Sequence, residues 1–184
     1  MSVPHSVCVF CGSRNGTKPE YVQSATDLGQ QMAKEGWRLV YGAGDVGLMG
    51  AVSRAAQDAG GSTFGVIPVH LLAREMAKRD LGSFIITENM HERKKVMFMN
   101  SDAIVVLPGG AGSLDEFFEV LTWRQLTLHA KPIYLVDIEG YWQPLLALIE
   151  QTINEGFADK SLRDFYVVVD TVDELVEALR ADLS

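Results

Sequence analysis

The sequence contains few cysteines, few prolines and no long apolar segment. Its 184 residues include two cysteines and six prolines. A chain of this length buries enough surface to fold without disulfides. No apolar run approaches the roughly 18 residues that a transmembrane helix needs, and the first residues, MSVPHSV, lack the basic and apolar regions of a signal peptide. We therefore expect a cytoplasmic protein with no membrane partner.

Basic residues are also scarce. The chain has 16 lysines and arginines against 24 acidic residues, and its net charge is −8. Proteins that bind polymeric nucleic acids usually display basic patches, so this balance argues against such a partner. A single nucleotide stays compatible with it, because one phosphate needs only a local positive site.

Clustered metal ligands are missing as well. The four histidines are scattered, and neither H-E-x-x-H nor a second C-x-x-C occurs. Cys8 and Cys11 form one C-x-x-C within an apolar, β-like run, whereas reactive thiolates usually lie at the N-terminus of a helix. We expect both cysteines to be small buried side chains, and we expect no metal ion or other cofactor.

Short β-rich runs alternate with amphipathic helical stretches along the whole chain. Strands are predicted at residues 6–12, 37–42, 63–68, 83–88, 102–110, 131–137 and 165–170. Helices are predicted at residues 19–36, 47–61, 69–80, 91–101, 113–129, 141–156 and 171–183. This alternation predicts one α/β domain spanning residues 1–184, with a Rossmann-like, doubly wound architecture of about seven parallel strands and helices on both faces.

Three glycine-containing loops follow predicted strands, at residues 11–16, 41–50 and 107–116. In a parallel sheet they meet at the carboxyl edge of the strands, where ligands bind. Each glycine could serve only the backbone geometry of a tight turn. Three such loops at one edge favour a phosphate or nucleotide site instead.

The second loop carries G-x-G-x-x-G at Gly42, Gly44 and Gly47. This spacing is typical of dinucleotide binding, but here it follows the second strand rather than the first. The acidic residue expected about 20 positions later is also missing. A nicotinamide-dependent oxidoreductase is therefore disfavoured, although recognition of a phosphate through this loop remains open.

The third loop, LPGGAGSLDE, places a carboxylate beside a phosphate-type turn. Ser113 and Glu116 have the S-x-x-E spacing of a capping box, which the spacing alone favours. The alternative is that Glu116 is a functional carboxylate. On a helical wheel the core face holds Leu114, Phe117, Phe118, Leu121 and Gln125, and the opposite side holds Glu116, Val120 and Trp123. We expect Trp123 to be half-exposed and to face a ligand or a second subunit.

The segment MHERKKVMFMN, residues 90–100, places Arg93, Lys94 and Lys95 early in a helix. The helix dipole disfavours cations at that end, and such local conflicts often mark functional sites. If Arg93 points to the strand ends, it supplies positive charge for a phosphate or a carboxylate. The alternative is a solvated charged face shared with Glu92.

Four segments, GLMG, MHERK, PGGAGSLDE and TWRQL, occur in the order and spacing of a known family. With CVFCGSRNG, VYGAGDVGLMG and FGVIP, they resemble the LONELY GUY (LOG) family of cytokinin riboside 5′-monophosphate phosphoribohydrolases across residues 6–136. The resemblance implies hydrolysis of the N-glycosidic bond of AMP or an N6-substituted AMP, to the free base and ribose 5-phosphate. It also implies a homodimer.

The resemblance further implies roles for individual residues. Glu116 and Arg93 match the catalytic positions, and the phosphate loop matches Gly109, Gly110, Gly112 and Ser113. The positions around the nucleotide match Ser13, Gly42, Gly44, Gly47, Met90 and Lys94. Ser113 stands where the family has Thr, and Ala43 interrupts the usual triple glycine before Asp45. We expect Ala43 to restrict the approach of the backbone and Asp45 to add negative charge at the mouth of the site.

Two other functions stay open beside the hydrolase. One is a carrier that binds a nucleotide or cofactor without turnover, like the molybdenum-cofactor carriers that share this kind of fold. The other is the disfavoured oxidoreductase. G-x-S-x-G and the Walker A sequence are both absent from the chain, which argues against a serine-hydrolase site and against P-loop phosphoryl transfer.

Overall fold

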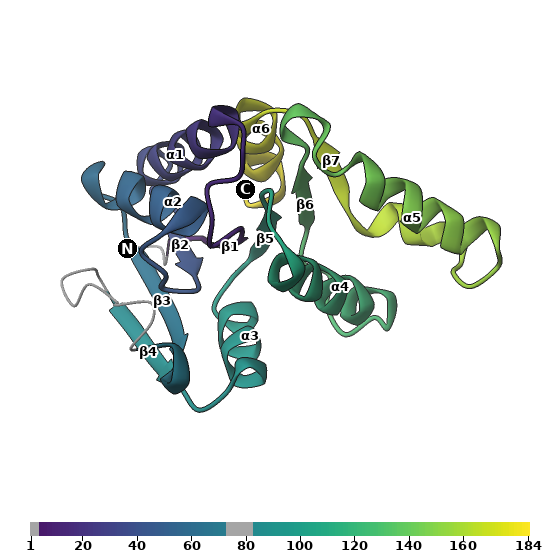
Figure 1. The fold of residues 1–184 in the computed structure, drawn as a ribbon, viewed down its shortest axis with the longest axis horizontal. Helices are drawn as coiled ribbons and strands as arrows, with labels where there is room; N and C mark the ends of the chain where they lie inside the picture. The colour runs from purple at the N-terminus through teal and green to yellow at the C-terminus, as the bar shows by residue number, and fades with distance from the viewer. Residues whose placement is uncertain (1–3, 73–82) are drawn as a thin grey trace.

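A computed structural model describes residues 4–72 and 83–184 of the chain. In it, seven parallel strands form a single sheet in the order β4-β3-β2-β1-β5-β6-β7 (Figure 1). The chain moves outward from β1 to one edge, returns to the centre at β5, and continues to the other edge. This is the doubly wound α/β arrangement predicted from the sequence.

Every predicted strand is present. The strands are β1 (Ser6–Phe10), β2 (Arg38–Tyr41), β3 (Thr63–Pro68), β4 (Ser83–Thr87), β5 (Ala103–Val106), β6 (Ile133–Val136) and β7 (Val167–Val169). The α-helices are α1 (Pro19–Lys34), α2 (Gly47–Asp58), α3 (Met90–Met99), α4 (Ala111–Gln125), α5 (Gln143–Asn154) and α6 (Val172–Asp182). Of the helix predicted at 69–80, the structure shows the short 3-10 turn η1 (Val69–Leu71), and residues 73–80 lie outside the described residues.

The helices cover both faces of the sheet because alternate strand residues point in opposite directions. Val7 and Val9 pack in a core with α1, α2 and α6. Cys8 and Phe10, the intervening residues, pack in a second core with α3, α4 and α5. Figure 1 shows these two groups of helices on either side of the strands. The central strands are thus buried on both faces, which explains their continuous apolar sequences.

Cys8 and Cys11 are free, buried thiols. Cys8 is completely buried, and Cys11 is 5% exposed. Burial raises the pKa of both thiols above the ordinary value, and the nearby Glu116 carboxylate raises both further. The prediction that they behave as small apolar side chains is confirmed.

The capping box predicted at Ser113 and Glu116 is wrong. The N-cap of α4 is Gly110, which forms no side-chain cap, and Ser113 lies inside the first turn of the helix. Ser113 is buried against Gly109, so the helix begins earlier than the spacing suggested and Glu116 lies in its second turn. An N-cap side chain does occur on α3, where Asn89 accepts a 3.0 Å hydrogen bond from the N–H of Glu92.

The buried face that the helical wheel predicted for α4 is partly wrong. The buried stripe contains Ser113, Phe117, Val120 and Leu121. Phe118 is 38% exposed and Gln125 is also exposed, whereas Val120, which the wheel placed opposite the core face, is buried. Trp123 is half-buried as expected, and its ring packs edge-on against Phe98 of the protein's own core at a centroid distance of 5.1 Å. Its contact with a ligand or a second subunit stays a prediction.

The chain reverses direction across the sheet between β1 and β5, which are neighbours. Loops that follow such a pair diverge to opposite sides and leave a crevice in which ligands bind. Here the N–H of Gly12, after β1, donates a 3.0 Å hydrogen bond to the carbonyl of Pro108, after β5. The first and third glycine loops are therefore in direct contact. No helix in the described part of the chain is long and apolar enough to cross a membrane.

Candidate active site

A cavity of about 460 Å³ opens at this reversal point, beyond the carboxyl ends of the strands. It brings together loop 11–16, the starts of α2, α3 and α4, and single residues of α1 and of the segment after β6. The predicted site residues that line it are Ser13, Met90, Arg93, Gly109, Gly110, Gly112, Ser113 and Glu116. Residues from all three glycine-loop regions, together with α3, therefore converge on one cavity.

The phosphate-type loop forms one wall of this cavity. The first helical hydrogen bond of α4 runs from the N–H of Leu114 to the carbonyl of Gly110, at 3.1 Å, so the preceding N–H groups have no partner within the helix. A side chain on Gly109 would lie 2.0 Å from the hydroxyl of Ser113, whereas Gly110 and Gly112 face open space. Free N–H groups at a helix N-terminus, with room above them, suit an anion, and binding of a phosphate here stays a prediction.

Arg93 is buried and points to the ends of the strands. It is 5% exposed. Its Nε donates to the carbonyl of Val66, within β3, at 3.1 Å, and one terminal nitrogen donates to the carbonyl of Gly42, after β2, at 2.9 Å. The other terminal nitrogen has a weak contact of 3.8 Å with the sulfur of Met90. The solvated face shared with Glu92 is thus ruled out, and a fixed positive charge lines the cavity.

Glu116 faces the same cavity from α4. Burial raises the pKa of its carboxyl to about 7, although the nearby Arg93 and Lys94 oppose this shift. Within residues 4–72 and 83–184 its carboxylate has no hydrogen bond or ion pair. A carboxyl group with such a pKa exchanges a proton near neutral pH, as a general acid or base requires.

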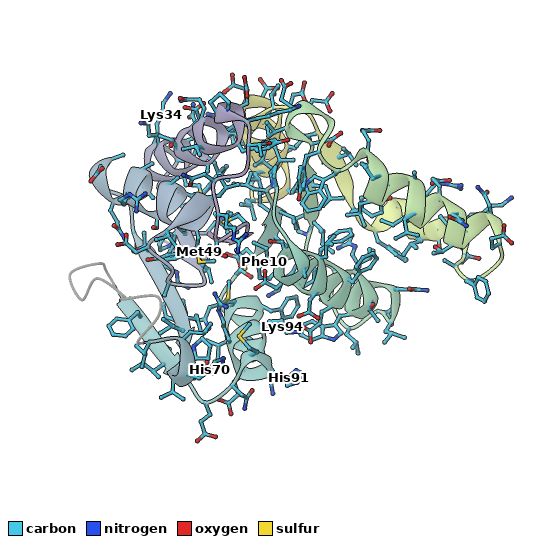
Figure 2. All side chains as sticks on the ribbon, viewed as in Figure 1. Phe10, Lys34, Met49, His70, His91 and Lys94 are labelled. Carbon is cyan, nitrogen blue, oxygen red and sulfur yellow. The ribbon has the colours of Figure 1, made fainter. Side chains whose placement is uncertain are left out.

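Lys94 does not line the cavity and lies between α3 and α4 (Figure 2). Its Nζ lies 2.8 Å from a carboxylate oxygen of Asp115 and 2.7 Å from one of Glu119, and its side chain is only 8% exposed. Burial alone would lower the pKa of Lys94, but these two hydrogen bonds outweigh it and raise the pKa. Lys94 therefore ties α3 to α4 on either side of Glu116, and its place beside a nucleotide stays a prediction.

The glycines of the second loop do not line the cavity but shape its edge. Gly42 supplies the carbonyl that holds Arg93, and the N–H of Gly44 lies 3.1 Å from the sulfur of Met49. Gly47 has a φ of 65° and packs so closely on the backbone of Ser13 and Arg14 that a side chain would overlap it. Contacts of these glycines with a nucleotide remain predictions.

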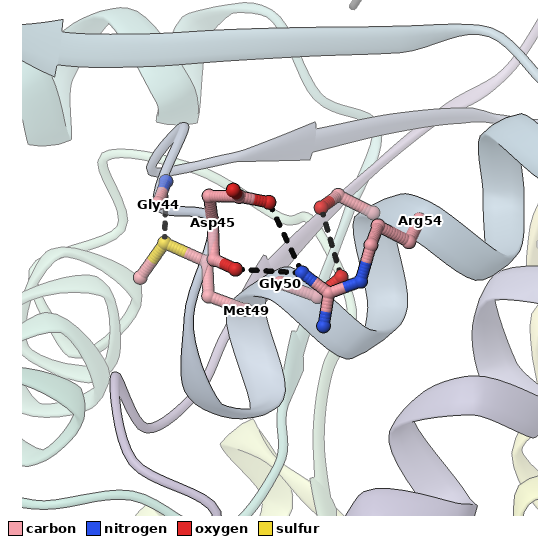
Figure 3. A network of polar contacts seen from close by, with 6 residues as sticks. Gly44, Asp45, Met49, Gly50 and Arg54 are labelled. Atoms are coloured by element: carbon pink, nitrogen blue, oxygen red, sulfur yellow. Dashed lines mark hydrogen bonds and ion pairs between the residues drawn. The ribbon is translucent and has the colours of Figure 1, made fainter. Parts of the chain in front are cut away.

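The two departures from the family sequence lie in this loop. Ala43 adopts a left-handed backbone with φ of 59°, and its side chain is buried against Gly65 rather than directed at the cavity. Arg54 donates to both the carbonyl and the carboxylate of Asp45, at 2.6 and 3.0 Å (Figure 3). Asp45 does not line the cavity, so the negative charge expected at the mouth is paired with Arg54 on α2.

Several cavity residues were missed by sequence reasoning. Arg14 and Asn15 line the cavity from loop 11–16, and the glycines of that loop had already indicated its position. Tyr21 on α1 and Tyr141 after β6 also line it. No local motif marks either tyrosine, because only the tertiary fold brings α1 and the segment after β6 to this edge.

Solved structures share this fold. The molybdenum cofactor (Moco) carrier protein from Chlamydomonas reinhardtii superposes with a TM-score of 0.74 at 23% identity, over 98% of each chain. The molybdenum cofactor binding protein from Rippkaea orientalis gives a TM-score of 0.74 at 21% identity, over 100% of each chain. At these identities the likeness concerns the architecture alone.

Sequence relatives are much more similar. The family described as "Possible lysine decarboxylase" matches residues 49–179. The probable cytokinin riboside 5′-monophosphate phosphoribohydrolase LOGL5 of Oryza sativa subsp. japonica is 46% identical over 170 residues, which cover 92% of this chain and 69% of that protein. The cytokinin riboside 5′-monophosphate phosphoribohydrolase LOG3 of Arabidopsis thaliana is 43% identical, with 94% and 80% covered. The chain therefore belongs to the LOG family of phosphoribohydrolases.

Proposed function

We propose that this protein hydrolyses the N-glycosidic bond of AMP or of an N6-substituted AMP, releasing the free base and ribose 5-phosphate. The observation that carries the proposal is the position of Glu116. Its carboxyl, with a pKa raised to about 7, lines the same cavity as the glycine-rich start of α4, whose free N–H groups suit an anion. A nucleoside monophosphate is long enough to meet both. The kinship with enzymes named phosphoribohydrolases supports the same reaction.

In this mechanism the 5′-phosphate binds the free N–H groups at the start of α4, and the substrate is oriented with C1′ of the ribose near Glu116. Cleavage of the bond to the base leaves positive charge on the ribose ring. The ionised Glu116 carboxylate stabilises that charge or takes a proton from the attacking water, whose oxygen bonds to C1′, and the departing base takes up the proton. Arg93 is held in place by two backbone carbonyls. Its positive charge lowers the pKa of Glu116, so a fraction of the protein molecules carries an ionised Glu116. Its remaining terminal nitrogen is offered to the substrate.

The test is release of base from a panel containing AMP, N6-isopentenyl-AMP, the matching ribosides and the triphosphates. Glu116→Gln should lose about 100-fold or more of kcat/KM, because a positioned acid-base group contributes this much. Glu150→Gln is the matched control, because it makes the same substitution on α5, at an exposed residue that pairs with Arg163 and does not line the cavity. Equal activity in Glu116→Gln and in the control would remove Glu116 from the reaction.

The second candidate is a carrier that binds a nucleotide or cofactor without turnover. The fold shared with the Moco carrier protein is the observation in its favour. A carrier has no need of an unpaired carboxyl with a raised pKa in its cavity, so Glu116 argues against it. Saturable binding of AMP in calorimetry, with no release of base from any nucleotide in the panel, would favour the carrier.

We also propose that the protein is a homodimer in the cytoplasm, as expected from the sequence. Large apolar side chains are exposed on α4 and just after it, where Phe118, Leu126 and Leu128 are 38%, 60% and 69% exposed. Association of two copies would bury such side chains. Light scattering should give about twice the chain mass at micromolar concentration, and a mass of one chain would contradict the dimer.

A further inference from the structure

Tyr141 reaches the cavity from an unusual turn. After β6, the turn η2 (Ile138–Gly140) contains two left-handed residues, Glu139 with φ of 55° and Gly140 with φ of 70°. A left-handed backbone is costly for a residue other than glycine, and such residues concentrate at functional sites. The buried carboxylate of Asp137 fixes the chain around the turn by accepting hydrogen bonds from the N–H of Trp142 and the side-chain amide of Gln143.

The side chain of Tyr141 contacts two parts of the site. Its ring lines the cavity and packs edge-on against Tyr21 of α1, with a centroid distance of 5.6 Å. Its hydroxyl donates a 2.6 Å hydrogen bond to the carbonyl of Gly109. Tyr141 is 37% exposed, so the ring is not needed to fill the core.

The hydrogen bond acts on the peptide group between Gly109 and Gly110. In a trans peptide the C=O and the following N–H point in opposite directions, so holding the carbonyl of Gly109 also fixes the N–H of Gly110. Both flanking residues are glycines, and glycine has access to backbone conformations that would let this peptide group turn over. Within the described residues, the Tyr141 hydroxyl is the hydrogen-bond donor to this carbonyl.

We propose that Tyr141 is a positioning residue that locks the Gly109–Gly110 peptide in the orientation that binds the phosphate group of the substrate. The inference rests on the proposed function for the identity of the substrate, but the phosphate site is open to a direct test. Tyr141 acts through the loop and takes no part in bond cleavage. Its contribution is therefore to binding of the phosphate and not to the chemical step.

The experiment compares Tyr141→Phe with the wild type and with Tyr134→Phe. The first variant keeps the ring and its contact with Tyr21, and loses only the hydroxyl. Tyr134 is the matched control, because its hydroxyl also donates one hydrogen bond, to Asp182 at 2.5 Å, outside the residues that line the cavity. The ligand is inorganic phosphate, titrated in chloride buffer and followed by thermal shift, and KM and kcat are measured with AMP.

Loss of one hydrogen bond should weaken phosphate binding about three- to tenfold in Tyr141→Phe. We expect KM for AMP to rise by a similar factor with kcat nearly unchanged, which is the signature of lost binding shared by the ground and transition states. Tyr134→Phe should bind phosphate like the wild type. A general loss of stability would not give this separation of KM from kcat.

The inference is overturned if Tyr141→Phe binds phosphate as tightly as the wild type, or if the wild type binds no phosphate. If no nucleotide releases its base while Tyr141→Phe still weakens phosphate binding, the proposed function fails and the role of Tyr141 stands. The two conclusions are thus distinguished by one set of variants.

Discussion

Glu116 is held in surroundings that favour its neutral form. Burial raises the pKa of its carboxyl from 4.5 to about 7, while the fixed charge of Arg93 limits the rise. Between these two pH values the folded protein binds more protons than the unfolded chain, so this group lowers stability as pH increases through the window. The protein thus retains a carboxyl group that lowers its stability when ionised, at the position where the proposed reaction needs it.

At the scale of this residue, we predict that Glu116→Gln is more stable than the wild type above neutral pH. The difference in the free energy of unfolding should reach ~3 kcal/mol at about pH 8, because the variant has no carboxylate to ionise. It should shrink as pH falls and vanish below the ordinary pKa of 4.5. Urea unfolding of both proteins across this range checks it, with Glu150→Gln as the control. A gap that does not change with pH would show that Glu116 is not the cause.

The buried cation Lys94 joins helices α3 and α4 beside the site. Lys94 binds Asp115 and Glu119, which lie on either side of Glu116 in the sequence of α4. Both carboxylates raise the pKa of Glu116, and Lys94 lowers it. The position of α4 and the ionisation of its functional carboxyl therefore depend on the same interhelical contact.

At the scale of these elements, Lys94→Met should destabilise the protein by about 1–3 kcal/mol, because Glu119 loses the hydrogen bond to its buried partner. Loss of the Lys94 charge should also raise the pKa of Glu116. The increase of kcat/KM that accompanies ionisation of Glu116 should therefore occur at a higher pH than in the wild type. Lys95→Met, which alters an exposed neighbour on the same helix, should change neither property. Denaturant unfolding and pH–rate profiles of the two variants provide the measurement, and identical profiles would contradict the proposed coupling.

Across the whole molecule, the cavity joins elements that are far apart in the chain. Its lining extends from Cys11 after β1 to Tyr141 after β6. A ligand bound there holds both halves of the doubly wound sheet. It should therefore stabilise the protein against unfolding.

At this scale, we predict that AMP at about 100 times its dissociation constant raises the free energy of unfolding by ~2.7 kcal/mol. NAD at the same concentration should have a much smaller effect, because the second loop lacks the acidic residue that holds the ribose of a dinucleotide. Thermal unfolding with each ligand checks this. Equal stabilisation by NAD would revive the oxidoreductase.

The sequence by itself determined the order of strands and helices, the burial of both cysteines and the three glycine loops. The spacing of apolar residues, the length of apolar runs and the presence of turn residues are properties of short segments, so they can be recognised in the sequence alone. The resemblance of the motifs to the LOG family indicated the family and predicted the roles of Arg93 and Glu116. The start of α4 was missed because the burial of Ser113 against Gly109 overrides the local capping signal.

Only the tertiary structure decided which polar groups meet. It paired Lys94 with two carboxylates on α4, tied Arg93 to the carbonyls of Val66 and Gly42, and brought Tyr141 to Gly109. Each of these contacts joins residues at least 21 positions apart. Such contacts depend on strand order and helix rotation, which are set by packing across the whole sheet and leave no local pattern in the sequence.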